Sequence, residues 1–580
     1  MRLRRLFETV PEAIAAGAAR TALDRPDIRG GDRIDGASWA SRSTVWGAHG
    51  AAATAHPLAS LIAIDILRAG GSAVDAAIAA NAALGFLEPI ACGIGGDAFA
   101  LLWDPKAGQV VGLNGSGRSP AGLSLETQRA RARDGMIAPR GAIAVSVPGA
   151  VDAWGALHAR YGKLKWADLF APAIALAEAG APVAQTVAYY LRVSHRIFTR
   201  PDAGIEEVEN FLRVWAPTGR TPAEGEMFAN PALARTYRLI AEGGARAYYE
   251  GEIAERIDAY FKRIGGWLSA ADLAAHHTEW VQPRSTGYRG VDVWALPPNG
   301  QGLSTLQILN ILETFDMAGL GFQTAASLHT QIEAKRLAFE DRARYFADPD
   351  FAALPIDWLI SKDYAAERAK LIRPDRILQP VFAGQAPSQG DTTYLCAADA
   401  DGMMVSLIQS NFHLMGSGLA PDGLGFMFQN RGELFHLADG HPNLYAPRKR
   451  PFQTIIPGFA TLGGQPWLAF GVMGGDMQPQ GQAQIIQSLV DHGLDITAAG
   501  DAPRWRHEGS SEPTGRPPSG NGLVRLESGV PAAAREGLAA LGWTFGASDG
   551  TLGGYQCIQR WPGRYAAASE MRKDGAALAY

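Results

Sequence analysis

Cysteine is scarce in this chain, which limits what could hold it together covalently. Only Cys92, Cys396 and Cys557 occur among 580 residues, and each lies in an apolar, strand-like stretch. Their spacing fits neither a disulfide framework nor a metal site, so buried free thiols are expected. A glycine cluster at 93–96 precedes a strand instead of opening a helix, which argues against a nucleotide-binding loop. We therefore expect neither a metal nor another cofactor.

Long apolar runs and an excess of either charge are also missing. No run reaches the roughly 18 apolar residues that a membrane span needs. The net charge of −5 and the pI near 6.2 give no reason to expect nucleic acid or a membrane surface as partner. The basic N-terminus is not followed by an adequate hydrophobic segment, so we expect no secretory signal and a cytoplasmic location, with the periplasm as the alternative.

One further absence concerns catalysis. No Gly-x-Ser-x-Gly sequence lies between an expected strand and an expected helix, which disfavours a conventional serine hydrolase. What the chain does have is 68 glycines and 47% hydrophobic residues. This composition is typical of a globular protein with a large core and many tight turns.

The most informative stretch begins with two adjacent threonines, Thr392 and Thr393, after a polar loop. A short apolar run follows, then the turn residues 399–402, then a second apolar run that ends in Gln409 and Ser410. Two such runs around an Asp/Gly cluster predict a β-hairpin. Folding the hairpin places Thr392 opposite Gln409 or Ser410, with one residue of register left open.

A threonine in this position has a specific chemical use. If the Asp391–Thr392 bond is cut, Thr392 gains a free α-amine, whose reference pKa is about 7.7–8.0. That amine can act as general base for the hydroxyl of the same residue. Taken alone, however, a threonine pair that opens a strand is far more often only a β-former.

The rest of the chain adds to this signal. Thr392-Thr393-Tyr394 and the turn Asp399-Ala400-Asp401-Gly402 resemble the strand and turn of the γ-glutamyltransferase family of autoprocessing N-terminal-nucleophile hydrolases. The resemblance runs from about Trp46 to Tyr580. It implies an α+β fold, a four-layer αββα sandwich in which two mainly antiparallel sheets lie between helices.

The same resemblance implies how the chain is divided. Residues 1–45 are an N-terminal extension, residues 46–391 form the large subunit, and residues 392–580 form the small catalytic subunit that begins at Thr392. The two subunits are expected to form a heterodimer, and a further pairing of heterodimers is left open.

The resemblance also assigns catalytic roles. Thr392 is the nucleophile, Ser410 bonds its hydroxyl, and the backbone N–H groups of Gly474 and Gly475 form the oxyanion hole. Glycine suits that role because the backbone must come close to the tetrahedral intermediate. His413 follows shortly after the hairpin, but the α-amine already serves as base, so a catalytic role for His413 is not required.

The expected substrate pocket departs from the family pattern in three places. After Asn430, Arg431 replaces a glutamine and Leu434 replaces the acid that holds the substrate ammonium in glutamyl-specific members; Glu433, one residue earlier, is a possible substitute. Gln453 and Thr454 replace a pair of serines. Arg118 lies two residues after the position at which γ-glutamyl enzymes of the family have an arginine that binds the substrate carboxylate. Arg118 is expected either to bind that carboxylate or to pair with a surface acid. The predicted substrate-binding residues are therefore Arg118, Asn430, Arg431, Glu433, Gln453 and Thr454.

These features predict a self-cleaving amidohydrolase or acyltransferase that acts on a small-molecule amide. The acyl group is γ-glutamyl or a related carboxylate-bearing group, and it passes to water or an amine. Losing an acid and gaining a guanidinium favours a carboxylate, as in relatives that act on cephalosporin side chains or oxamate. The alternative from another class is a non-catalytic relative with a binding role.

Charged residues on the expected helix 325–346 are spaced for ion pairs within the helix, so we assign them a structural role.

Overall fold

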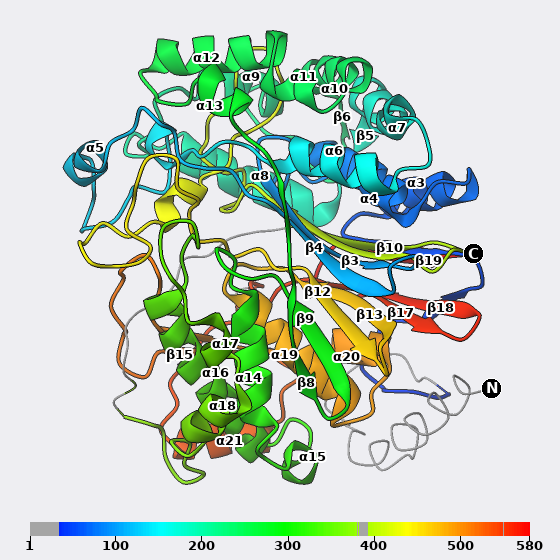
Figure 1. Ribbon diagram of the computed structural model, residues 1–580, viewed down its shortest axis with the longest axis vertical. Helices are drawn as coiled ribbons and strands as arrows, with labels where there is room; N and C mark the ends of the chain where they lie inside the picture. Colours follow the sequence, from blue (N-terminus) through cyan, green and yellow to red (C-terminus); the bar gives the residue numbers. More distant parts are fainter. Residues whose placement is uncertain (1–33, 380, 382–392, 549) are drawn as a thin grey trace.

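Two seven-stranded sheets lie face to face at the centre of the molecule, and helices cover both outer faces (Figure 1). The computed structural model describes residues 34–379, 381, 393–548 and 550–580. In both sheets every neighbouring pair of strands is antiparallel. The expected αββα sandwich is confirmed.

The first sheet has the order β1-β18-β17-β13-β12-β9-β8. Its strands are β1 (Val45–Gly47), β18 (Arg564–Ser569), β17 (Tyr555–Trp561), β13 (Gln465–Val472), β12 (Gly458–Leu462), β9 (Val291–Ala295) and β8 (Arg284–Tyr288). The second sheet has the order β19-β2-β10-β11-β3-β4-β7. Its strands are β19 (Ala576–Ala579), β2 (Ala51–Thr54), β10 (Thr393–Ala398), β11 (Met404–Ser410), β3 (Asp97–Asp104), β4 (Gln109–Gly115) and β7 (Glu279–Val281).

Each sheet combines strands from both sides of the predicted cleavage point. In the second sheet, β10 lies between β2, from the N-terminal part of the chain, and its hairpin partner β11. In the first sheet, β12 lies beside β9 and β18 beside β1. The boundaries predicted at residues 45 and 391 remain predictions, but the segments on either side of residue 391 share one fold.

Helices cover the second sheet on its outer face, in the upper part of Figure 1. They include α3 (Pro57–Arg68), α4 (Ala73–Leu87), α6 (Ala150–Tyr161), α7 (Trp166–Ala179), α10 (Pro231–Gly243) and α12 (Glu252–Ile264). Every residue of α4 is buried, because this helix packs between α7 and the sheet. Small alanines all around α4 allow that close approach on every side.

A second helical layer covers the first sheet. It contains α14 (Gly302–Leu312), α16 (Ala325–Tyr345), α18 (Lys362–Ala369), α19 (Met477–Val490) and α20 (Ile496–Asp501). Beside it, α21 (Ala532–Ala540) packs on α16 together with a small sheet of β14 (Trp505–Glu508), β15 (Leu523–Leu526) and β16 (Phe545–Gly546). No helix in the described ranges is long and apolar enough to cross a membrane.

Strand β10 shows how the sandwich is built from its sequence. Tyr394 and Cys396 pack into the core between the two sheets, whereas Leu395 and Ala397 pack against the helices above. A strand buried on both faces needs apolar residues at every position, which explains the unbroken apolar run. All three cysteines are buried and free, as the sequence predicted.

Candidate active site

The predicted β-hairpin is present, and its open end is where the candidate site begins. Thr393 pairs with Gln409. At the turn, the Asp399 carboxylate accepts from the backbone N–H groups of Asp401 and Met403, while Gly402 takes a φ of 89°. Thr392, the predicted nucleophile, and the Asp391–Thr392 bond lie outside the described residues, so the register is fixed from Thr393 onward.

Side chains anchor both strands at this end. The Thr393 hydroxyl donates to the buried carboxylate of Glu88 at 2.9 Å. Ser410 lies at the end of β11, beside Asp97 of β3, and its hydroxyl accepts from the Phe412 N–H at 2.8 Å. The predicted partner of the nucleophile is therefore buried, and its pairing with β3 holds it in place.

Gly474 and Gly475 form a tight loop between β13 and α19. Their φ angles are 110° and 56°, a backbone region that favours glycine. Within the described part of the chain, no group accepts a hydrogen bond from the N–H of either glycine. Gly474 also lines an open cavity. Free N–H groups at a cavity are the geometry that an oxyanion hole requires.

A buried polar network fixes this loop. The Gln301 side-chain N–H₂ donates to the carbonyls of Gly475 at 2.9 Å and Thr454 at 2.6 Å. Arg342, on α16, donates to the Gln301 carbonyl at 2.6 Å and to the carboxylate of Asp476 at 2.5 Å. Neither Gln301 nor Arg342 was singled out as a site residue from the sequence.

The cavity beside Gly474 has a volume of about 730 Å³ and is open to solvent. Its lining carries five cationic and three anionic side chains: Arg133, Arg140, Arg506, Arg516 and Lys573, against Asp134, Glu433 and Glu512. Burial raises the pKa of Glu512 well above its ordinary value, with a contribution from the Asp476 charge.

Two of the lining residues contact each other. The Nδ1 atom of His413 lies 2.9 Å from the carboxylate of Glu433, and both side chains are largely buried. Glu433 is thus the one predicted substrate-binding residue that borders this cavity, and its carboxylate lies against the His413 ring. Asn430 supports the same region, because its amide accepts from the His413 N–H and donates to the Pro139 carbonyl.

Arg431, Gln453 and Thr454 lie beneath the cavity surface instead of lining it. Arg431 donates to the Thr454 hydroxyl at 2.9 Å, and Gln453 donates to the carboxylate of Asp97 at 2.7 Å. Burial lowers the pKa of Arg431 to about 10, and the negative charges of Asp97 and Glu433 only partly offset this effect by raising the pKa. These three predicted residues, together with Asp97, form a buried polar layer, and a direct contact with substrate remains a prediction.

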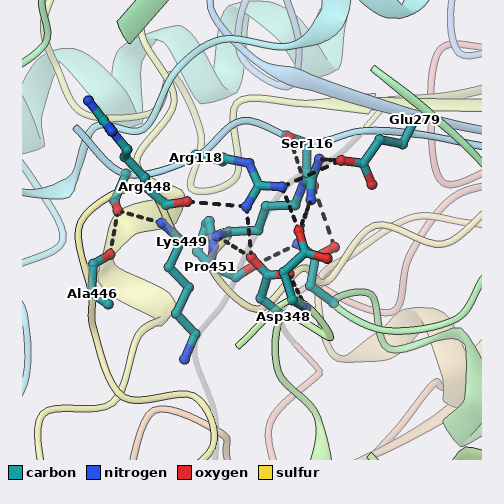
Figure 2. Close-up of polar contacts among 12 residues, drawn as sticks. Ser116, Arg118, Glu279, Asp348, Ala446, Arg448, Lys449 and Pro451 are labelled. Carbon is teal, nitrogen blue, oxygen red and sulfur yellow. Dashed lines mark hydrogen bonds and ion pairs between the residues drawn. The ribbon is translucent and has the colours of Figure 1, made fainter. Parts of the chain in front are cut away.

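Arg118 lies away from the cavity, in an ionic cluster of its own (Figure 2). Its guanidinium contacts the carboxylates of Asp350 at 2.7 Å, Asp348 at 3.3 Å and Glu279 at 3.4 Å. Arg450 shares two of these acids. With three carboxylates around it, Arg118 takes the alternative role stated above, pairing with acids, and it is not placed to bind a substrate carboxylate in this cavity.

The described residues contain no group of three or more His, Cys, Asp or Glu side chains that could hold a metal ion. The arrangement has instead the parts for acyl transfer: a strand that begins next to a threonine, a serine on its partner strand, and a loop of free N–H groups at an open cavity.

Comparison with known proteins decides the family. The model of the family described as Gamma-glutamyltranspeptidase matches residues 59–580. The chain belongs to this family. Its members are hydrolytic enzymes with an N-terminal threonine nucleophile, so the prediction of an enzyme of that class is confirmed.

Relatives of this gamma-glutamyltranspeptidase-family chain differ in the names they carry. The glutathione hydrolase-like YwrD proenzyme of Bacillus subtilis is 36% identical, over 78% of this chain and 83% of the relative. The oxamate amidohydrolase proenzyme of Klebsiella pneumoniae is 33% identical, over 79% of this chain and 85% of the relative. The crystal structure of cephalosporin acylase from Bacillus halodurans is 40% identical, covers 95% of this chain and 99% of that chain, and superposes with a TM-score of 0.85.

Proposed function

We propose that this protein cuts itself between Asp391 and Thr392 and then hydrolyses N-acyl amides whose acyl group ends in a carboxylate. Scission exposes the α-amine of Thr392, which takes the proton from the Thr392 hydroxyl. The hydroxyl oxygen attacks the amide carbonyl, and the N–H groups of Gly474 and Gly475 stabilise the oxyanion. The C–N bond then breaks, the amine leaves with a proton, and water hydrolyses the resulting ester.

The charge around the cavity carries the substrate part of this proposal. Five cationic side chains line it against three anionic ones, and the carboxylate of one of these, Glu433, lies 2.9 Å from His413. A site of this kind attracts an anionic acyl group and offers little to an ammonium group. The names of the cephalosporin acylase and oxamate amidohydrolase relatives agree with this direction.

The second candidate is γ-glutamyl hydrolysis or transfer. Glu433 lines the cavity and would suit a substrate ammonium if it were freed from His413. The glutathione hydrolase-like name of one relative also favours this candidate. Release rates with a glutaryl anilide and a γ-glutamyl anilide separate the two, because the substrates differ only in the α-ammonium group. Faster release from the glutaryl compound is expected, and much faster release from the glutamyl compound would overturn the substrate assignment.

Processing is tested on the purified protein by denaturing gel. Self-scission gives fragments of about 390 and 190 residues that remain together as a heterodimer in native solution. Sequencing the smaller fragment should return Thr392 as its first residue, and Thr392→Ala should stay full-length. A full-length band from the unmodified protein that matches the Thr392→Ala band would favour the non-catalytic relative instead.

A further inference from the structure

A second cavity adjoins the one beside Gly474 and has no part in the chemistry described above. Its volume is about 430 Å³, and it is open to solvent. The two cavities share one wall, whose lining residues are Arg133, Ala138, Pro139, Arg140 and Ile197. Gly474 lines the first cavity and not the second. The second cavity therefore lies farther from the proposed oxyanion hole than the first.

The lining of this second cavity is rich in arginine. Its cationic residues are Arg131, Arg133, Arg140 and Arg200. Arg200 comes from the loop after α8 (Gln185–Phe198), and the other three come from one stretch of chain far from it in sequence. The acids in the lining are Asp202 and Glu206, and the Glu206 carboxylate already accepts from the Ala142 N–H at 2.8 Å. The cavity thus carries an excess of positive charge.

Aromatic rings, and not carboxylates, hold two of these guanidinium groups. Arg131 lies over the Trp267 ring at 4.8 Å, and Arg140 lies over the Phe198 ring at 5.7 Å. Within the described residues, none of the four arginines has a carboxylate oxygen within ion-pair distance. A guanidinium that stacks on a ring keeps the N–H donors at its edge available to an anion.

Three of the four arginines can reach a ligand directly. Arg140 donates to the Pro139 carbonyl at 2.9 Å. The other three, Arg131, Arg133 and Arg200, are exposed, and within the described part of the chain their side chains make no hydrogen bond. Like charges gathered at one cavity repel one another, and an anion bound between them relieves that repulsion. Arginine donors arranged in this way suit a carboxylate.

The amine half of the substrate is the half that this cavity suits. After the C–N bond breaks, the acyl group stays on the nucleophile, whereas the amine must leave towards solvent and water must enter. We propose that Arg131, Arg133 and Arg200 form a subsite that binds a carboxylate carried by the leaving amine. This inference rests on the proposed amide hydrolysis, but it does not depend on which acyl group is cleaved.

The test compares glutaryl amides that differ only in the amine half. Two anionic amines, 4-aminobenzoate and the longer 4-aminohippurate, cover the reach to the second cavity, and the others are uncharged aniline and 4-trimethylammonioaniline. Each compound is assayed with the unmodified protein and with Arg131→Gln, Arg200→Gln and the combined variant. Comparing variant with unmodified protein on one compound at a time cancels the intrinsic reactivity of that compound.

The combined variant should raise KM about five-fold for at least one anionic compound, with little change in kcat. It should leave the uncharged anilide unaffected and lower KM for the cationic one. Arg196→Gln is the control, because it removes an exposed arginine of α8 that lines neither cavity and should match the unmodified protein.

Changes in KM of equal size for the anionic and uncharged compounds would overturn the inference. So would an Arg196→Gln variant that behaves like the combined one, because net charge alone would then account for the effect. Failure of the proposed function looks different, since the unmodified protein would stay uncut or prefer γ-glutamyl compounds. In the second case the same amines are tested as γ-glutamyl amides. For an uncut chain, calorimetry with free 4-aminohippurate decides: binding that the combined variant loses supports the subsite, and no binding to the unmodified chain refutes it.

Discussion

Arg342 donates a hydrogen bond of 2.5 Å to the carboxylate of Asp476, and this ion pair joins the long helix α16 to the residue that follows the two loop glycines. The guanidinium is fully buried and also reaches Gln301, which holds the Gly475 carbonyl. The position of the proposed oxyanion hole is thus set by α16, a helix of the layer that covers the outer face of the first sheet.

Replacing Arg342 should therefore affect both stability and catalysis. Arg342→Met leaves the buried Asp476 without its partner, and breaking a buried ion pair in this way costs about 3–5 kcal/mol. A lower thermal midpoint is expected, together with a fall in kcat that exceeds any change in KM. Arg344→Met, on the exposed side of the same helix, is the matched control and should change neither quantity. A kcat equal to that of the control would show that the network does not position the loop.

Gly474→Ala tests the loop directly. A Cβ atom there would lie 3.3 Å from the Gly553 Cα and the Met477 Cβ, in a backbone region that disfavours side chains. The alanine keeps its N–H, but the backbone shift moves this donor out of place, so kcat should fall by up to about 10²–10³, the cost of losing one oxyanion donor. Gly464→Ala is the control. Gly464 lies at an exposed turn with φ 72°, and an added Cβ would have no neighbour within 4 Å, so this variant introduces the backbone strain without a change near the site and should retain full kcat. Similar kinetics for the two variants would contradict the assignment.

Thr393 is expected to position the start of β10. Thr393→Val removes the donor to the buried Glu88 carboxylate and should lower the free energy of unfolding by about 1–3 kcal/mol. Self-scission should also slow, which a time course on a denaturing gel would follow in freshly translated protein. Thr393→Ser keeps the hydroxyl and should be processed normally. Slow processing in Thr393→Ser together with normal processing in Thr393→Val would mean that the methyl group, not the hydrogen bond, matters.

Asp97 gives the chain a specific pH dependence. Burial raises the pKa of Asp97 from 3.8 to about 6. The charge of Arg431 and the hydrogen bonds from Gly117, Gln453 and Gln429 lower the pKa but only partly offset burial. The folded protein therefore binds this proton more tightly than the unfolded chain, so stability rises as the pH falls from about 6 to 4. At about 1.4 kcal/mol per pH unit, the gain relative to Asp97→Asn approaches 3 kcal/mol. Urea titrations of both proteins at pH 7 and pH 4 measure it, and a constant difference between them would refute the assignment.

The parts of the fold that follow from local patterns were predictable from the sequence. The β-hairpin, its turn and its register to within one residue came from two apolar runs around an Asp/Gly cluster. The glycine loop at 474 and 475 was assigned from the resemblance to the family, and the structure gives both glycines the positive φ that explains the residue type.

The partners of the buried charges were not predictable in this way. Arg342 has helical spacing to acids on its own helix, yet its carboxylate partner is Asp476, 134 positions later in the chain. Arg118 likewise meets Asp348 and Asp350 more than two hundred residues away. Long side chains reach partners that only the packing of distant elements brings near, so spacing along one helix or one loop does not decide which acid a guanidinium meets.

The mixing of strands from both segments in each sheet has a consequence for how the protein is produced. A cut before Thr392 would remove one covalent bond, whereas the hydrogen bonds of β10 to β2 and of β11 to β3 would still join the two pieces. Neither piece contains all the strands of either sheet. After folding, neither piece can therefore be exchanged for a copy that was made separately. A single gene thereby supplies both halves in equal copy number, and no assembly step has to match them.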